Sequence, residues 1–217
     1  MKQILAALML GTILAGCGNA SDTTEEKSSQ KSVPKQETPV SIEKSAAYVP
    51  NPQLPDDREL TTVNQSVSDD KGELTLKKMV QPDATHTIGP ITMKIEEMKV
   101  FHARPSYGMI DFFHGFTHDE SFDLVKTRVT ITNTGDKPVT FNPVAHFKLD
   151  AKTEKTIEDD VYLESLATTY APSETRTGNF GFIIEQPLTS VELLTSDVLN
   201  EKRDVIKKGV SVSTQLK

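Results

Sequence analysis

The feature of this sequence that most constrains its fold is an alternation of polar and apolar side chains with a period of two. It is clearest over residues 125–132. The two alternating sets are Val125, Thr127, Val129 and Ile131, and Lys126, Arg128, Thr130 and Thr132. A period of two places each set on its own face of a β-strand. We therefore predict a strand here with one buried face and one face in water.

The same period recurs in further segments, each bounded by Gly, Pro, Asp or Asn, which are typical of turns and loops. These segments start near Leu74, Ile91, Val139, Ala145, Phe180, Val191 and Val210. In the second of them the alternation breaks at Glu96-Glu97, which predicts a β-bulge. Together the segments predict seven to eight strands of ordinary length and no helix longer than two turns.

One-sided alternation is typical of antiparallel sheets that bury one face, so we expect an all-β fold, a sandwich of two antiparallel sheets. The folded domain is expected over residues 73–217, a length that can bury a core of its own. The chain has no Trp and one Cys, so it lacks the core Trp and the disulfide bridge that are common in antibody domains. The core must therefore be built from aliphatic and Phe side chains.

Two hairpin patterns, VTITNTGDKPV over residues 129–139 and APSETRTGNFGF over residues 171–182, carry a family resemblance. In the first, Gly135 can take a positive φ angle in the turn. Both patterns resemble the telokin-like, immunoglobulin-like domains found in lipoproteins of Gram-positive bacteria. The resemblance covers about residues 73–195, with Ser173 where that family usually carries Gly. It implies an immunoglobulin-like β-sandwich at the cell surface, and it brings no active-site residues.

The first seventeen residues are typical of a bacterial export signal. A short basic start precedes an apolar run of 11 residues from Ile4 to Leu14. Because a helix that spans a bilayer needs about 20 residues, this run has the length of a signal-peptide core. The sequence Leu14-Ala15-Gly16-Cys17 resembles the lipobox of bacterial lipoproteins, in which a diacylglycerol is joined to the cysteine sulfur. The resemblance implies a signal peptide over residues 1–16 and lipidation of Cys17, which becomes the new N-terminus.

Lipidation has a direct consequence for location. Each buried CH₂ group contributes about 0.8 kcal/mol to membrane binding, and two acyl chains such as palmitate hold a protein firmly where one holds it only marginally. We therefore expect a lipid-anchored protein on the extracytoplasmic face of the cytoplasmic membrane. No other segment is apolar enough to cross that membrane.

Residues 17–72 are expected to form the lipidated Cys and a disordered tether. Ser, Thr, Gln, Lys, Glu and Pro dominate this stretch, and residues 18–72 include 10 acidic and 6 basic side chains. So little apolar surface cannot offset the entropy lost on ordering the backbone. One alternative remains open: because Leu60, Val63 and Val67 recur at helical spacing, Asp56 to Asp70 could pack on the domain as a short helix or an extra strand.

Between residues 101 and 122 the alternation disappears, and this stretch holds three of the five His and five of the nine Phe. A connection of this length in a compact domain is usually functional or disordered, and its aromatic content argues against disorder. One interpretation is a cap, with the Phe side chains buried over an open edge of the sandwich. A second is an exposed aromatic patch that binds a protein or another apolar partner, formed by Tyr107, Phe112, Phe113 and Phe116.

A third interpretation of the same loop is a divalent-metal site. Its ligands would be His102, His114 and His118 with Asp111, Asp119 or Asp123. The spacing of the last two histidines would place both imidazoles on one side of a helical turn, as zinc ligands require. Gly115 between them disfavours such a helix.

Composition and motifs argue against several classes of function. The net charge is −7 and no run of Lys or Arg is long, so nucleic acid is not an expected partner. The sequence contains no GxSxG, no Gly-rich phosphate loop and no HExxH motif. The adjacent acidic residues 158–160 are expected to be solvated, because neighbouring positions seldom converge on one bond.

We therefore expect a protein that is not an enzyme and needs no cofactor. Its expected role is that of a non-catalytic recognition or scaffolding module at the cell envelope, with an unknown envelope protein or wall component as partner. The alternative is a lipoprotein that binds a divalent metal or a solute through the histidine loop.

Overall fold

The computed structural model describes residues 50–150 and 152–216. The predicted signal peptide, the lipobox, Cys17 and the predicted tether up to residue 49 lie outside these residues. In chain order the strands are β1 (Ser66–Asp69), β2 (Gly72–Val80), β3 (Ala84–Ile88), β4 (Ile91–Pro105), β5 (Phe122–Asn133), β6 (Val139–Phe141), β7 (His146–Lys148), β8 (Glu154–Lys155), β9 (Thr168–Tyr170), β10 (Thr175–Ile184), β11 (Ser190–Leu194), β12 (Val198–Leu199), β13 (Val205–Lys207) and β14 (Ser211–Gln215).

Over the residues that the structure describes, helical structure is limited to short turns. They are the 3₁₀ turns η1 (Tyr107–Met109) and η2 (Ile157–Asp159) and the four-residue helix α1 (Ile110–Phe113). Over residues 50–150 and 152–216, no helix has the length and apolar character needed to cross a membrane.

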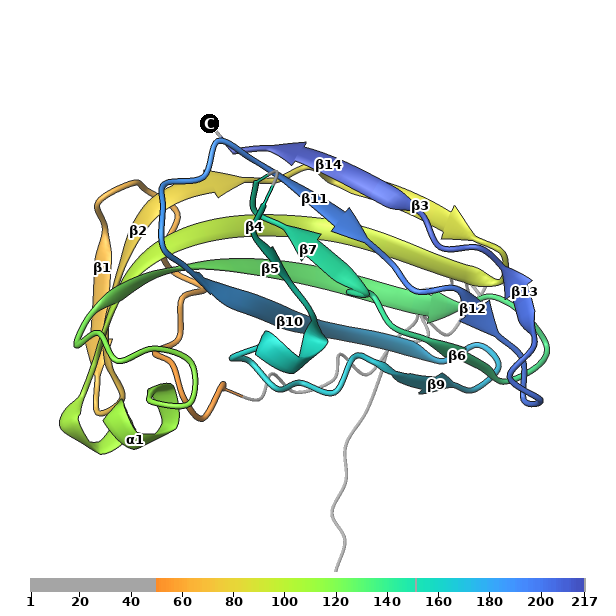
Figure 1. Ribbon diagram of the computed structural model, residues 1–217, viewed down its shortest axis with the longest axis horizontal. Coiled ribbons are helices and arrows are strands. Elements are labelled where there is room, and N and C mark those ends of the chain that lie inside the picture. Colours follow the sequence, from red (N-terminus) through yellow and green to blue (C-terminus); the bar gives the residue numbers. More distant parts are fainter. Residues whose placement is uncertain (1–49, 151, 217) are drawn as a thin grey trace, which may run out of the picture. The chain divides into compact units, whose positions relative to one another are not determined.

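A six-stranded sheet forms one layer of the domain. Its strands run in the order β1-β2-β4-β5-β10, and β3 pairs with the start of β4. Two four-stranded sheets, β14-β11-β7-β8 and β13-β12-β6-β9, form the other layer; Figure 1 shows β11 and β7 crossing in front of the long strands β4 and β5. All these pairings are antiparallel. The predicted all-β, antiparallel sandwich is confirmed.

The main hydrophobic core lies between the two layers. The long strands contribute Met93, Val129 and Phe180, and the smaller sheets contribute Phe141 and Phe147, all at most 1% exposed. The core consists mainly of aliphatic and Phe side chains, as expected, and it also includes Tyr170. The structure has more strands than predicted, because β1, β8 and β12 have only two to four residues and so show no clear period.

The predicted bulge in β4 is confirmed. Ile95 and Glu97 pair with consecutive residues of β5, so Glu96 is the additional residue between them. As a result, both glutamates reach cations on the outer face of the six-stranded sheet, the face turned away from the main core. Glu96 Oε2 lies 3.0 Å from Arg128 Nε, and Glu97 Oε1 lies 3.3 Å from Lys126 Nζ.

A second hydrophobic cluster covers part of this outer face. From the sheet it includes Leu74, Leu76, Phe101, Ala103, Phe122, Leu124 and Ile183. The side chains that cover them are Leu54, Leu60, Phe113, Val161 and Tyr162. The domain therefore buries apolar surface on both faces of its largest sheet.

The folded domain starts earlier than the predicted boundary at residue 73, which is a correction. Leu54 and Leu60 are 3% and 1% exposed in the second cluster, and β1 forms an edge of the sheet by pairing with β2. Asn51 donates a hydrogen bond from its side chain to the carbonyl of Tyr162. Thus the alternative of an extra strand is the one that holds for residues 66–69. A few well-placed apolar groups are enough to order a polar segment when a sheet face is available to receive them.

The turns of the two hairpin patterns differ in backbone conformation. Gly135 does not have a positive φ; its lack of a side chain matters because a Cβ there would lie 3.0 Å from the Cβ of Pro90. Ser173 does have a positive φ, of 60°. This left-handed backbone conformation is strained for a serine, because its Cβ lies too close to the following carbonyl oxygen.

Candidate functional site

The aromatic loop folds back on the domain as a cap. Phe113 at the end of α1 is 2% exposed, and its ring centroid lies 5.0 Å from that of Phe122. Phe112 and Phe116 are half-buried against the same cluster. Phe113 is therefore a core residue, which corrects its assignment to an exposed patch. Tyr107 is 93% exposed and is the one predicted contact residue that lies fully on the surface.

The histidines of the loop are brought together only in part. His114 and His118 have ring centroids 5.7 Å apart, as their spacing predicts. His102 lies on β4, and its Nδ1 is 2.8 Å from Oδ1 of Asp123. Asp111 is exposed on α1. In the described part of the chain, no three His, Cys, Asp or Glu side chains converge as metal ligands would.

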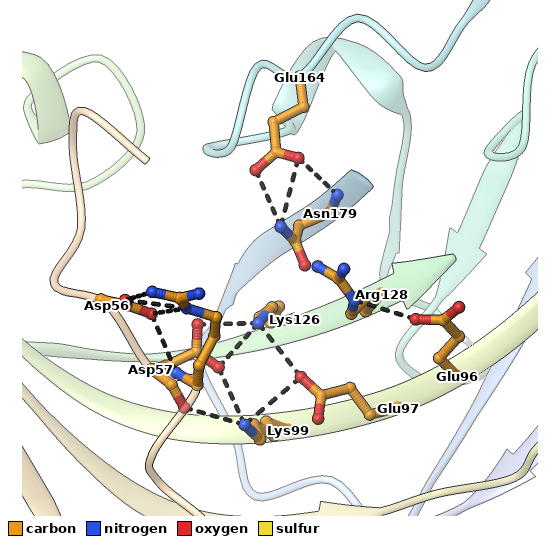
Figure 2. Close-up of polar contacts among 10 residues, drawn as sticks. Asp56, Asp57, Glu96, Glu97, Lys99, Lys126, Arg128, Glu164 and Asn179 are labelled. Carbon is orange, nitrogen blue, oxygen red and sulfur yellow. Dashed lines mark hydrogen bonds and ion pairs between the residues drawn. The ribbon is translucent and has the colours of Figure 1, made fainter. Parts of the chain in front are cut away.

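A cluster of buried charges on the outer face of the six-stranded sheet is the most unusual polar feature of the described residues (Figure 2). Lys99 on β4 and Lys126 on β5 are 1% and 3% exposed. Lys126 Nζ lies 2.8 and 2.7 Å from the two carboxylate oxygens of Asp57, and Lys99 Nζ lies 3.1 Å from one of them. Glu97 Oε1 lies 3.4 and 3.3 Å from the same two lysines. Each buried ammonium group is thus paired, as burial of a charge requires.

Three separate parts of the chain build this cluster. The bulge turns Glu97 toward the lysines, and the segment that precedes β1 carries Asp57 across the sheet. The alternation over residues 125–132 predicts a solvated face at Lys126. That expectation is wrong, because residues 51–60 cover this part of the face.

Further polar pairs surround the buried lysines. Asp56 binds Arg58, whose Nη2 lies 2.6 Å from Oδ2 of the carboxylate. On β10, Asn179 donates from its side-chain nitrogen to both oxygens of Glu164, at 3.0 and 3.2 Å. Together with the pair of Arg128 and Glu96, they continue the polar surface from β4 to β10.

A cavity of about 190 Å³ opens among these groups. It is lined by Arg58, Glu97, Lys126, Arg128 and Asn179. The lining thus comes from the segment before β1 and from β4, β5 and β10. The residues offer both hydrogen-bond donors and acceptors, and none of them is an activated nucleophile paired with a base.

Asp160, expected to be solvated, is instead buried at 4% exposure against β10. Burial raises the pKa of its carboxyl group to about 6, even though the backbone N–H groups of Gly181, Tyr162 and Leu163 donate to it. Gly181 leaves the space for this segment, because a Cβ there would lie 2.7 Å from the ring of Tyr162. Asp160 therefore has a structural role, because its carboxylate joins residues 160–163 to β10.

Sequence reasoning missed the buried cluster and its cavity. The double glutamate at the bulge was the only signal of an unusual site, because a bulge places consecutive side chains on one face. Nothing in the pattern near Asp57 distinguishes it from the other acidic residues of the polar segment.

Comparisons with known proteins complete the description. A family model described as "Domain of unknown function (DUF4352)" matches residues 61–205. "Uncharacterized protein YdhF" of Bacillus subtilis (strain 168) is 40% identical over 217 residues, which cover 99% of this chain and 91% of that protein. A crystal structure of a functionally unknown protein from Listeria monocytogenes EGD-e matches with a TM-score of 0.51 and 12% identity, over 67% of this chain and 89% of that chain. The structural match shows a common fold.

Proposed function

Because the chain belongs to the family described as a domain of unknown function (DUF4352), which supplies no activity, we propose its function from its sequence and geometry. We propose a lipid-anchored lipoprotein on the extracytoplasmic face of the membrane, which presents a telokin-like, immunoglobulin-like sandwich as a non-catalytic recognition module. The observation that carries this proposal is the lipobox sequence Leu14-Ala15-Gly16-Cys17 after a short apolar run.

The proposed tether lies between Cys17 and the described part of the domain. Among the described residues Asn51 is the first buried one, and 33 residues (18–50) separate it from Cys17. A flexible chain of that length has a root-mean-square span of about 30 Å. A tether of this kind confines the domain near the membrane and raises its effective concentration toward envelope partners to about the millimolar range.

The proposed contact with a partner centres on Tyr107. Its side chain is 93% exposed, whereas Phe113 in the same loop is part of the second hydrophobic cluster. An aromatic side chain on a well-supported loop provides contact area with little loss of conformational entropy on binding. Because Phe113 is buried in the second hydrophobic cluster, the loop that carries Tyr107 is held on the domain, unlike a flexible connection.

The anchor is tested by mass spectrometry of the protein from its native membrane, together with fractionation of two variants. We expect Cys17 to carry a diacylglycerol at the N-terminus of the mature chain. Cys17→Ala should abolish lipid attachment, whereas Gly18→Ala beside it should leave attachment unchanged. An unmodified Cys17 in protein recovered from the cytosol would refute the proposal.

The recognition role is tested by proximity labelling in the native cell. Tyr107→Ala should lose neighbours that the unchanged protein labels, while its thermal stability stays the same. An identical set of labelled neighbours would remove Tyr107 from the proposed contact.

A further inference from the structure

We propose that the cavity on the outer face of the six-stranded sheet binds a small zwitterion, a molecule with one carboxylate and one ammonium group, in the class of small α-amino acids. The cavity of about 190 Å³ is bounded by side chains from four parts of the chain. An engineered protein cavity of about 150 Å³ binds benzene, so a cavity of this size has room for a ligand of about six non-hydrogen atoms. Alanine has this size. The inference is independent of the lipid anchor and of the aromatic loop.

The first argument is the balance of charge around the cavity. The basic side chains in and next to it are Arg58, Lys99, Lys126 and Arg128, and the acidic ones in ion pairs with them are Asp56, Asp57, Glu96 and Glu97. A further carboxylate, that of Glu164, is bound by Asn179. Because every cation already has an acidic partner, a simple anion such as sulfate or phosphate would add uncompensated charge. A zwitterion leaves the balance unchanged.

The second argument is an unpartnered acceptor in the lining. Asn179 is 8% exposed, and donation from its Nδ2 to both oxygens of Glu164 fixes the orientation of the amide. Its Oδ1 therefore points away from Glu164, on the side of Arg128 (Figure 2), and within the described residues this buried atom has no hydrogen-bond partner. A buried carbonyl oxygen without a donor is unfavourable, and the ammonium group of a ligand would supply that donor.

Glu97 provides a second acceptor beside it. Its Oε1 is shared by two lysines at 3.3 and 3.4 Å, distances longer than those of ordinary charge-assisted hydrogen bonds. A carboxylate can accept about four hydrogen bonds, so Glu97 keeps capacity for an ammonium group.

Arg128 provides the complementary donors. Its Nε donates to Oε2 of Glu96 at 3.0 Å, and within the described part of the chain the two terminal nitrogens make no hydrogen bond. A guanidinium group binds a carboxylate through two parallel N–H···O bonds, which fixes the orientation of the bound group. The carboxylate of the ligand would therefore lie on Arg128 and its ammonium group on Asn179 and Glu97.

The test is calorimetric titration of the full chain with alanine and with three probes that each carry a single kind of charge: acetate, ethylammonium and phosphate. We expect binding of alanine and no binding of the three probes. Arg128→Gln should weaken alanine binding about tenfold or more, as expected for loss of charge-assisted hydrogen bonds. The matched control is Arg176→Gln on β10: Arg176 also pairs through Nε with a glutamate, Glu174, at 2.7 Å, but it lies outside the cavity lining.

Each other result overturns the proposal. Binding of acetate or phosphate as tight as that of alanine would mean a simple anion site, and equally tight binding of ethylammonium would mean a simple cation site. No heat with alanine would mean a cavity that holds water only. Unchanged binding in Arg128→Gln would place the ligand elsewhere. If that variant does not fold, as judged by circular dichroism, Arg128→Lys replaces it, because it keeps the charge and removes the two-bond geometry.

Discussion

Lys126 Nζ lies 2.7 Å from Oδ2 of Asp57, although the two residues are 69 positions apart in the chain. Both side chains are buried, and the same carboxylate accepts a hydrogen bond from Lys99. The contact fastens the segment before β1 to the outer face of the six-stranded sheet. A lysine that strand periodicity assigns to water is thus buried by a residue from a segment whose composition is typical of a tether.

Asp57→Asn should destabilise the domain strongly. It removes the carboxylate shared by two buried lysines, and loss of one partner of a buried ion pair costs about 3–5 kcal/mol. Urea denaturation measures the change. The control is Asp56→Asn, which breaks the more exposed pair with Arg58 and should cost at most about 1 kcal/mol. Equal effects of the two substitutions would show that the buried cluster does not hold this segment.

Phe113→Ala and Tyr107→Ala should change the free energy of unfolding by very different amounts, because Phe113 lies in the core of the aromatic loop and Tyr107 on its surface. Phe113 is 2% exposed, and truncation of a buried Phe costs about 3–5 kcal/mol. Tyr107 is 93% exposed, so its truncation should change the free energy of unfolding by less than about 0.5 kcal/mol. Chemical denaturation of both variants checks the difference. A small effect at Phe113 would contradict its place in the second cluster.

Ser173→Gly should stabilise the protein. The φ angle of 60° at Ser173 is one that glycine adopts without strain, so the substitution should contribute about 1 kcal/mol and raise the melting temperature by about 2–4 °C. Ser173→Ala is the control, because alanine keeps the Cβ that causes the strain. Calorimetry should show a gain for glycine alone, and an equal gain for alanine would exclude backbone strain as the cause.

Asp160 should make the stability depend on pH between about 4 and 6. Burial raises the pKa of its folded form to about 6, above the ordinary value of 3.8, so the folded state binds a proton more tightly than the unfolded state. Its contribution to stability is therefore complete below about pH 3.8 and is lost as the pH rises through about 6. From pH 7.5 to pH 5 it should add about 1 kcal/mol to the free energy of unfolding.

The measurement is urea denaturation at both pH values for three proteins. Asp160→Asn should lose this part of the pH dependence, and Glu158→Gln, which changes an exposed neighbour, should retain it. If Asp160→Asn kept the same pH dependence as the unchanged protein, another group would be responsible.

Much of the fold follows from local patterns in the sequence. Alternation predicts the long strands β4, β5 and β10, and its interruption predicts the bulge at Glu96. The sequence pattern predicts too late a start for the domain, because Leu54 and Leu60 are isolated in a polar segment and show no periodicity. The candidate cavity could not be predicted, since its lining residues come from four segments whose proximity depends on the completed sheet.

The sequence by itself determined the class of the fold, because a period of two is a local property that each strand shows before any partner is known. It also contains the continuous stretch Leu14-Ala15-Gly16-Cys17 after an apolar run, on which the proposed export signal and lipid anchor depend. Only the tertiary structure decided which polar side chains are buried. The burial of Lys99 and Lys126 depends on a distant segment that covers them and provides the carboxylate of Asp57. The ion pairs that compensate the two lysine charges therefore form only in the assembled domain.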